Sequence, residues 1–86
     1  MQPQTAAARA IVDFLAQRLA QLGRPTAVSA DLAVFESGVL DSVALVELVG
    51  VVEQAAGREV DMLMFDPTVV VTATDLMEQL EAALVT

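Results

Sequence analysis

Apolar residues recur at helical spacing in three separate segments of this chain, and this periodicity limits its fold more than any other feature. The apolar positions of the first segment are Ile11, Phe14, Leu15, Leu19 and Leu22. Because residues three or four positions apart share one face of a helix, this stripe predicts an amphipathic helix. Thr5 is placed to cap its amino end, and Gly23 followed by Pro25 is typical of a helix stop.

The second segment predicts a helix that begins at Asp41 or Ser42 and stops at Gly57. Its inward stripe consists of Leu45, Leu48, Val49, Val52, Ala55 and Ala56. The remaining faces are also largely apolar, because they carry Val43 and Val46. A helix that is apolar nearly all round is either fully buried or offers its outer face to a partner. A chain of 86 residues cannot bury it on every side, so we expect a docking surface.

Two further helices are indicated in the last third of the chain. Asp66 before Pro67 is typical of a helix start and predicts a short third helix that ends near Val71. Thr72 with Asp75 three residues later resembles a capping box and opens a closing helix. The apolar stripe of that helix contains Leu76, Leu80 and Leu84, with Met77 and Ala83 beside them.

Residues 25–41 follow neither the helical nor the strand period, which predicts a long ordered loop. Its Leu32 and Phe35 are expected to fill the core. The expected fold is therefore all-α: a four-helix bundle with a short third helix and a long loop between helices one and two. It forms a single domain of residues 1–86.

The charge of the chain excludes several kinds of partner. Twelve acidic residues against four basic ones give a net charge of −8. Such a charge repels phosphate backbones and anionic lipid, so neither nucleic acid nor a membrane surface is an expected partner. The longest apolar stretch, residues 43–52, contains Glu47 and is far shorter than the roughly 20 residues of a membrane span.

The chain has no histidine and no cysteine, which removes most catalytic chemistry. Nucleophilic dyads and triads, zinc sites of the usual type and disulfides all need these residues. The aspartates show no spacing that singles out a carboxylate pair for acid–base work. We therefore expect a protein that is not an enzyme and binds no metal. The missing cysteine also fits a cytoplasmic protein, and a monomer is expected.

One hydroxyl stands at a chemically distinctive place. Ser42 follows a glycine-bearing loop and begins the second helix. The amino end of a helix has unpaired N–H groups and a partial positive charge, which favour an anionic group esterified to that hydroxyl. The alternative is that Asp41 and Ser42 only cap the helix, which is the commonest role of such residues.

The residues around Ser42 resemble the acyl and peptidyl carrier protein family. The family signature is a glycine, a hydrophobic residue and then Asp-Ser-Leu. The matching residues here are Gly38, Leu40, Asp41, Ser42 and Val43. Two residues separate Gly38 from Asp41 where the commonest pattern has one, a spacing more similar to D-alanyl carrier proteins and to some free-standing carriers of amino-acid or polyketide pathways.

The resemblance implies that Ser42 carries a covalent 4′-phosphopantetheine from coenzyme A, with Asp41 as the preceding aspartate of the family. The terminal thiol of that group would hold an acyl or aminoacyl cargo as a thioester. The implied partners are a phosphopantetheinyl transferase, an adenylating ligase or acyltransferase, and downstream enzymes of natural-product or other secondary biosynthesis. The start at Met1 and the sequence after the last helix suit a free-standing carrier.

A partner surface is expected beside Ser42. Val43, Val46 and Gly50 would form its apolar centre. Acidic residues that could steer basic partners are Glu36, Asp41, Glu47 and Glu53, of which Glu53 fits a merely solvated face better. Met62 and Met64 belong to an apolar run, residues 62–65, that would contact partner or cargo, although such a run is more often core.

The rival hypothesis belongs to a different class of function. A small helical adaptor would bind another protein through the same apolar helix, and Ser42 would then serve only as a helix cap. The two hypotheses differ in whether the Ser42 hydroxyl can be modified.

Overall fold

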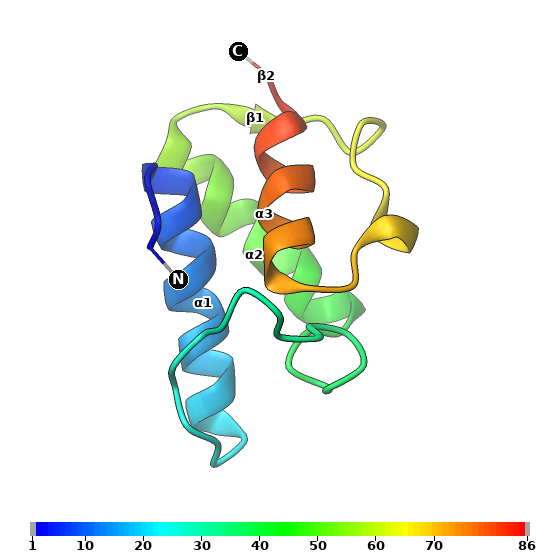
Figure 1. The fold of residues 1–86 in the computed structure, drawn as a ribbon. Coiled ribbons are helices and arrows are strands. Elements are labelled where there is room, and N and C mark those ends of the chain that lie inside the picture. Colours follow the sequence, from blue (N-terminus) through cyan, green and yellow to red (C-terminus); the bar gives the residue numbers. More distant parts are fainter. Residues whose placement is uncertain (1, 86) are drawn as a thin grey trace.

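The computed structural model describes residues 2–85, so Met1, on which part of the free-standing expectation depends, lies outside the described residues. Within this range the chain forms three α-helices, α1 (Ala6–Gln21), α2 (Ser42–Ala56) and α3 (Ala73–Ala82). A single 3-10 turn, η1 (Pro67–Val69), precedes α3. Two short strands, β1 (Glu59–Val60) and β2 (Leu84–Val85), complete the described part (Figure 1). The prediction of a mainly helical fold is confirmed.

The predicted starts of α1 and α3 and the predicted end of α2 are confirmed by their caps. The Oγ1 of Thr5 accepts a hydrogen bond from the N–H of Ala8 at 3.0 Å at the start of α1. Gly57 ends α2 in the left-handed conformation with φ 65°, which glycine adopts without steric cost. At the start of α3, Thr72 and Asp75 form the reciprocal capping box.

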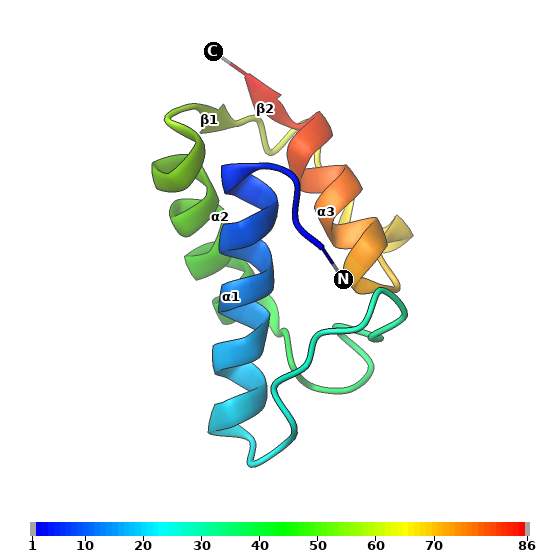
Figure 2. The same cartoon turned by 60° about the vertical axis from the view of Figure 1, so that its left-hand side comes forward.

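One hydrophobic cluster joins the buried faces of the three helices. Helix α1 lies along α2, and α3 also packs against α1 (Figure 2). The buried stripe residues of the helices are Ile11, Leu15, Leu19, Leu48, Val52, Leu76 and Leu80. Leu22 was predicted in the first stripe but is 45% exposed, because α1 ends one residue before it. Ala55 is likewise exposed rather than inward.

The all-α prediction is wrong at the end of the chain, because β1 and β2 pair antiparallel. Glu59 lies opposite Val85, and Val60 lies opposite Leu84. Leu84, predicted to continue the stripe of the last helix, thus belongs to a strand. Strands of two residues are too short to show an alternating pattern, so the sequence carries no local signal for this pairing.

The predicted third helix is reduced to the single turn η1, so the described residues do not establish a four-helix bundle. The backbone turns extended at Val70, whose side chain is buried. The carbonyl of Val71 accepts a hydrogen bond from the N–H of Val34 at 3.1 Å. These β-branched residues favour extended backbone, and the loop supplies the partner that the sequence did not reveal.

The loop between α1 and α2 is packed into the core, as expected, but through different residues. Val34, Val39 and Leu40 are almost completely buried, whereas Leu32 and Phe35 are only partly buried. The loop crosses from the end of α1 to the start of α3 before it turns into α2 (Figure 2). Within residues 2–85, no helix is long and apolar enough to cross a membrane.

Candidate functional site

Ser42 is the first residue of α2, and its side chain is exposed. The N-cap is Asp41: its Oδ1 accepts a hydrogen bond from the N–H of Ala44 at 2.7 Å. The capping role that an Asp-Ser pair usually performs is therefore filled by the aspartate alone. The Ser42 hydroxyl lies at the solvent boundary of the helix terminus, among N–H groups that have no partner within the helix.

The loop that leads into Ser42 is held by two arginines. Arg18, in the last turn of α1, donates from Nε to the carbonyl of Val39 at 2.9 Å. Arg24 donates from Nη1 to the carbonyl of Ser37 at 2.8 Å. These two carbonyls flank Gly38, whose φ of 80° lies in the left-handed region. The chain is therefore anchored on both sides of Gly38, shortly before α2 begins.

Acidic side chains precede and follow Ser42 in the sequence, and Arg18 pairs with one of them. The Nη2 of Arg18 lies 3.7 Å from the Oδ2 of Asp41, whose side chain is 63% exposed, so this ion pair contributes little to stability. Glu36 and Glu47 are exposed. Glu53, expected on a solvated face, instead accepts a hydrogen bond from the N–H of Val60 at 2.9 Å and joins α2 to β1.

Large apolar side chains lie in solvent on the first turns of α2. Val43 is 67% exposed and Val46 is 71% exposed. Gly50 follows on the same helix, is exposed, and has nothing within 4 Å of the position where a Cβ would be. The residues predicted for the apolar centre of contact are thus accessible and lie on the helix that begins with Ser42.

The run of residues 62–65 is mostly not core. Met62 and Met64 are half exposed, Leu63 is 97% exposed, and only Phe65 is buried. The reason is a turn at Asp61 that was not predicted. The Oδ1 of Asp61 accepts a hydrogen bond from the N–H of Leu63, and its carbonyl accepts one from the N–H of Met64, each at 2.9 Å. An aspartate two residues before the exposed position is a signal for such a turn.

This turn does not start beside Ser42. The N–H of Asp61 donates to the carbonyl of Ala83 at 2.8 Å, and β1 before it follows the carboxyl end of α2. The methionines thus leave the fold where α2 and α3 end, whereas Val43 and Val46 lie where α2 begins. The structure divides the predicted contact residues into two separate groups.

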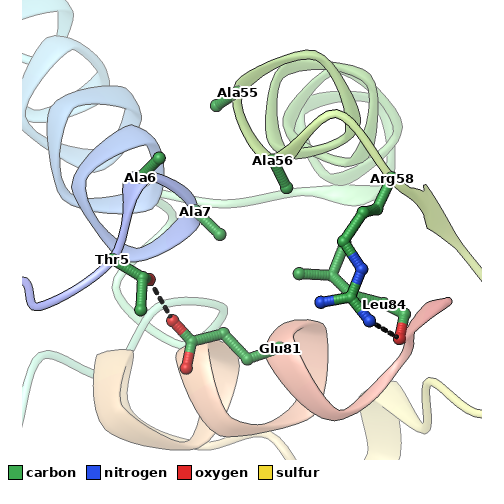
Figure 3. A pocket seen from close by; sticks show the side chains of 8 residues that line it. All are labelled: Thr5, Ala6, Ala7, Ala55, Ala56, Arg58, Glu81 and Leu84. Atoms are coloured by element: carbon green, nitrogen blue, oxygen red, sulfur yellow. Dashed lines mark hydrogen bonds between the residues drawn. The ribbon is translucent and has the colours of Figure 1, made fainter. Parts of the chain in front are cut away.

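A cavity of about 320 Å³ lies at the carboxyl end of α2, which sequence reasoning did not find (Figure 3). It is lined by Thr5, Ala6, Ala7, Ala55, Ala56, Arg58, Glu81 and Leu84. Thr5 donates from Oγ1 to Glu81 Oε1 at 2.7 Å, and Arg58 donates from Nη2 to the carbonyl of Leu84 at 3.1 Å. The alanines leave space because their side chains are too short to fill the gap between the helices. Along α2, Ala55 lies roughly 20 Å from Ser42.

Asp66 and Asp75, away from Ser42, have lowered pKa values. Hydrogen bonds from the hydroxyl and N–H of Thr68 lower the pKa of Asp66, and those from the N–H groups of Thr72 and Val71 lower the pKa of Asp75. Both are local turn or cap contacts. Among residues 2–85, no group of three or more carboxylates is arranged to hold a metal ion.

Ser42 is thus an accessible hydroxyl between an anchored loop and an apolar helix face. Comparisons of the chain with models of protein families, with curated proteins and with solved structures found no match.

Proposed function

We propose that this protein is a carrier that holds an acyl or aminoacyl group as a thioester on 4′-phosphopantetheine attached to Ser42. The observation that carries the proposal is that two neighbouring residues at the start of α2 have different roles. Asp41 caps the helix, and the serine hydroxyl beside it stays exposed. The fold would then be a variant of the carrier four-helix bundle in which η1 takes the place of the third helix.

The surroundings of Ser42 fit a covalently attached phosphodiester. Its side chain is exposed, and Gly38 before it has open space where a Cβ would be. The guanidinium of Arg18 lies beside Asp41 and partly balances the carboxylate that would otherwise repel a phosphate. When bound, the group supplies a thiol that this cysteine-free chain lacks.

The chain's own part in loading is to present a nucleophile. The Ser42 hydroxyl gives its proton to a base of the phosphopantetheinyl transferase and attacks the pyrophosphate of coenzyme A, from which adenosine 3′,5′-bisphosphate leaves. An adenylating ligase or acyltransferase then supplies the cargo, and downstream biosynthetic enzymes of the cytoplasm consume it. The carrier would work as a monomer whose tether raises the local concentration of cargo at each docked enzyme.

The surface that partner enzymes contact during loading would lie on α2 and consist of Val43, Val46, Glu47 and Gly50. Exposed valines beside the modified serine are suited to give a small interface its apolar centre, and Glu47 adds a charge that steers basic partners. Met62 and Met64 would form a second contact region, because flexible thioether side chains adapt to differently shaped partners.

The test is loading of the purified protein with coenzyme A and a broad-specificity phosphopantetheinyl transferase. Mass spectrometry should find one added phosphopantetheine group on the wild type and on the control variant Ser29→Ala. The Ser42→Ala variant should gain no mass. No mass gain on a wild type with native circular dichroism would reject the carrier proposal and favour the adaptor, which would bind its partner through the exposed Val43 and Val46 of α2.

A further inference from the structure

Arg18 links α1 to both residues that flank Leu40. Its Nε donates to the Val39 carbonyl at 2.9 Å, and its Nη2 lies 3.7 Å from the Asp41 carboxylate. Its Nη1 donates to Gln21 Oε1 at 3.3 Å, which holds the guanidinium on the last turn of α1. The side chain is only 26% exposed. A planar guanidinium can make such contacts together, which a lysine ammonium does less well.

The contact to Val39 is the stronger of the two. It is a charge-assisted hydrogen bond in a partly buried place. Without Arg18 the Val39 carbonyl would lose its partner, and a partly buried carbonyl without a partner destabilises the conformation that buries it. Gly38 lies next to this carbonyl and has no side chain to limit its rotation. The loop would then move about Gly38, and the start of α2 would move with it.

We infer that Arg18 is a positioning residue for the modification of Ser42. It acts through the Val39 carbonyl to hold the backbone that leads into α2, so that a transferase meets the hydroxyl in one orientation. This inference depends on the proposed function for its enzymatic consequence. Its structural part, the anchoring of residues 38–44, does not depend on that function.

The chain offers a matched control on the same helix. Arg9 also lies on α1 and is exposed near its amino end, far along the helix from the Ser42 loop. Arg18→Gln and Arg9→Gln make the same change in net charge. Arg18→Lys keeps the charge and removes the Nε donor. The three variants therefore separate the hydrogen bond to Val39 from the loss of a positive charge.

The experiment measures kcat and KM of Ser42 loading together with amide hydrogen exchange of residues 38–44. We expect Arg18→Gln to lower kcat/KM about tenfold relative to Arg9→Gln, at both low and high salt, because one anchoring hydrogen bond is lost. Arg18→Lys should fall between the two. Exchange of the amides of residues 38–44 should accelerate in Arg18→Gln and stay unchanged in Arg9→Gln.

Equal loading of Arg18→Gln and Arg9→Gln would overturn the inference, as would a difference that disappears in high salt, which would mark a charge effect. If Arg18→Gln does not fold, a wild-type loading rate of folded Arg18→Lys overturns it and a reduced rate supports it. If the wild type itself is not loaded, the proposed function fails. The exchange data then still decide whether Arg18 anchors the loop.

Discussion

The two ends of α2 differ in the contacts that surround them. At the amino end, Ser42 and the valines that follow it are exposed, and the loop before them is held by arginine side chains on backbone carbonyls. At the carboxyl end, small alanines line a cavity, and hydrogen bonds join Thr5 to Glu81 and Arg58 to Leu84. Both ends have conventional caps, Asp41 and Gly57.

Apolar side chains are exposed near both ends of α2, on the helix itself at Val43 and Val46 and in the turn after β1 at Leu63. The carboxyl end closes the fold through β1 and β2 and the Thr5–Glu81 hydrogen bond. At the amino end, Val43 and Val46 are exposed to water although the helix is already capped by Asp41. Isolated exposed apolar residues need no explanation, but two on adjacent turns beside an accessible hydroxyl favour a contact surface.

The largest expected effect concerns the anchoring of the amino end. Leu40 is 1% exposed, so Leu40→Ala should lower the free energy of unfolding by about 3 kcal/mol through lost burial and a residual cavity. Leu63→Ala makes the same change at a side chain in solvent and should alter it by less than about 0.5 kcal/mol. Urea unfolding followed by circular dichroism measures both. Similar values would mean that the amino end is not packed as described.

The next effect separates the two ends by function. Val46→Ala should lower kcat/KM of Ser42 loading about tenfold, because it truncates the proposed centre of contact. Val51→Ala removes the same atoms from a partly exposed position farther along α2 and should change the rate less than about twofold. The loading assay with both variants tests this. Equal loading rates for the two variants would contradict the proposal that Val46 lies in the contact surface.

A smaller effect is expected when the glycines that flank α2 are compared with the glycine inside it. Gly38 and Gly57 have φ of 80° and 65°, so alanine at either site should destabilise the fold by about 1 kcal/mol. Gly50 lies inside α2 with open space around it, and Gly50→Ala should stabilise by about 0.8 kcal/mol. Thermal and urea unfolding give the signs. A stabilised Gly38→Ala variant would show that the loop before Ser42 is not held in its left-handed turn.

The smallest effect concerns acid sensitivity near the loop that leads to Ser42. The N–H groups of Thr72 and Val71 hold the pKa of Asp75 below its ordinary value of 3.8 in the folded state. A lowered folded pKa stabilises the fold above the unfolded value, and this contribution is lost as the pH falls through the folded value. Asp75→Asn should therefore reduce stability at neutral pH and make the decline below about pH 4 shallower.

Urea unfolding at a series of pH values checks this, with Asp31→Asn as an exposed control. An unchanged acid decline in Asp75→Asn would contradict the assigned cap.

The parts of the fold that the sequence predicted correctly are those governed by neighbours in the chain. The caps at Thr5, Asp41 and Thr72 and the stop at Gly57 involve residues within a few positions of each other. The exposure of Val43 and Val46 also followed from the sequence, because a helix in a chain this small has one face without a partner.

Two of the failures concern residues far apart in the chain. The pairing of Val60 with Leu84 and the hydrogen bond between Val34 and Val71 depend on where distant segments meet. The turn that exposes Leu63 is local instead, because Asp61 accepts its hydrogen bonds. Leu32 and Phe35 of the loop pack against the core as expected but stay partly buried, whereas Val34, Val39 and Leu40 are almost completely buried. A segment without periodicity does not indicate which of its apolar residues lie deepest.

The amino-acid order alone therefore determined three helices and the caps at Thr5, Asp41, Gly57 and Thr72, because helical hydrogen bonds and caps connect residues three or four positions apart. Tertiary structure alone decided that Arg18 reaches the Val39 carbonyl across the loop and that alanines from two helices face one cavity. Such contacts form only when packing of the apolar core brings segments together, and no short stretch of sequence encodes the distance between them.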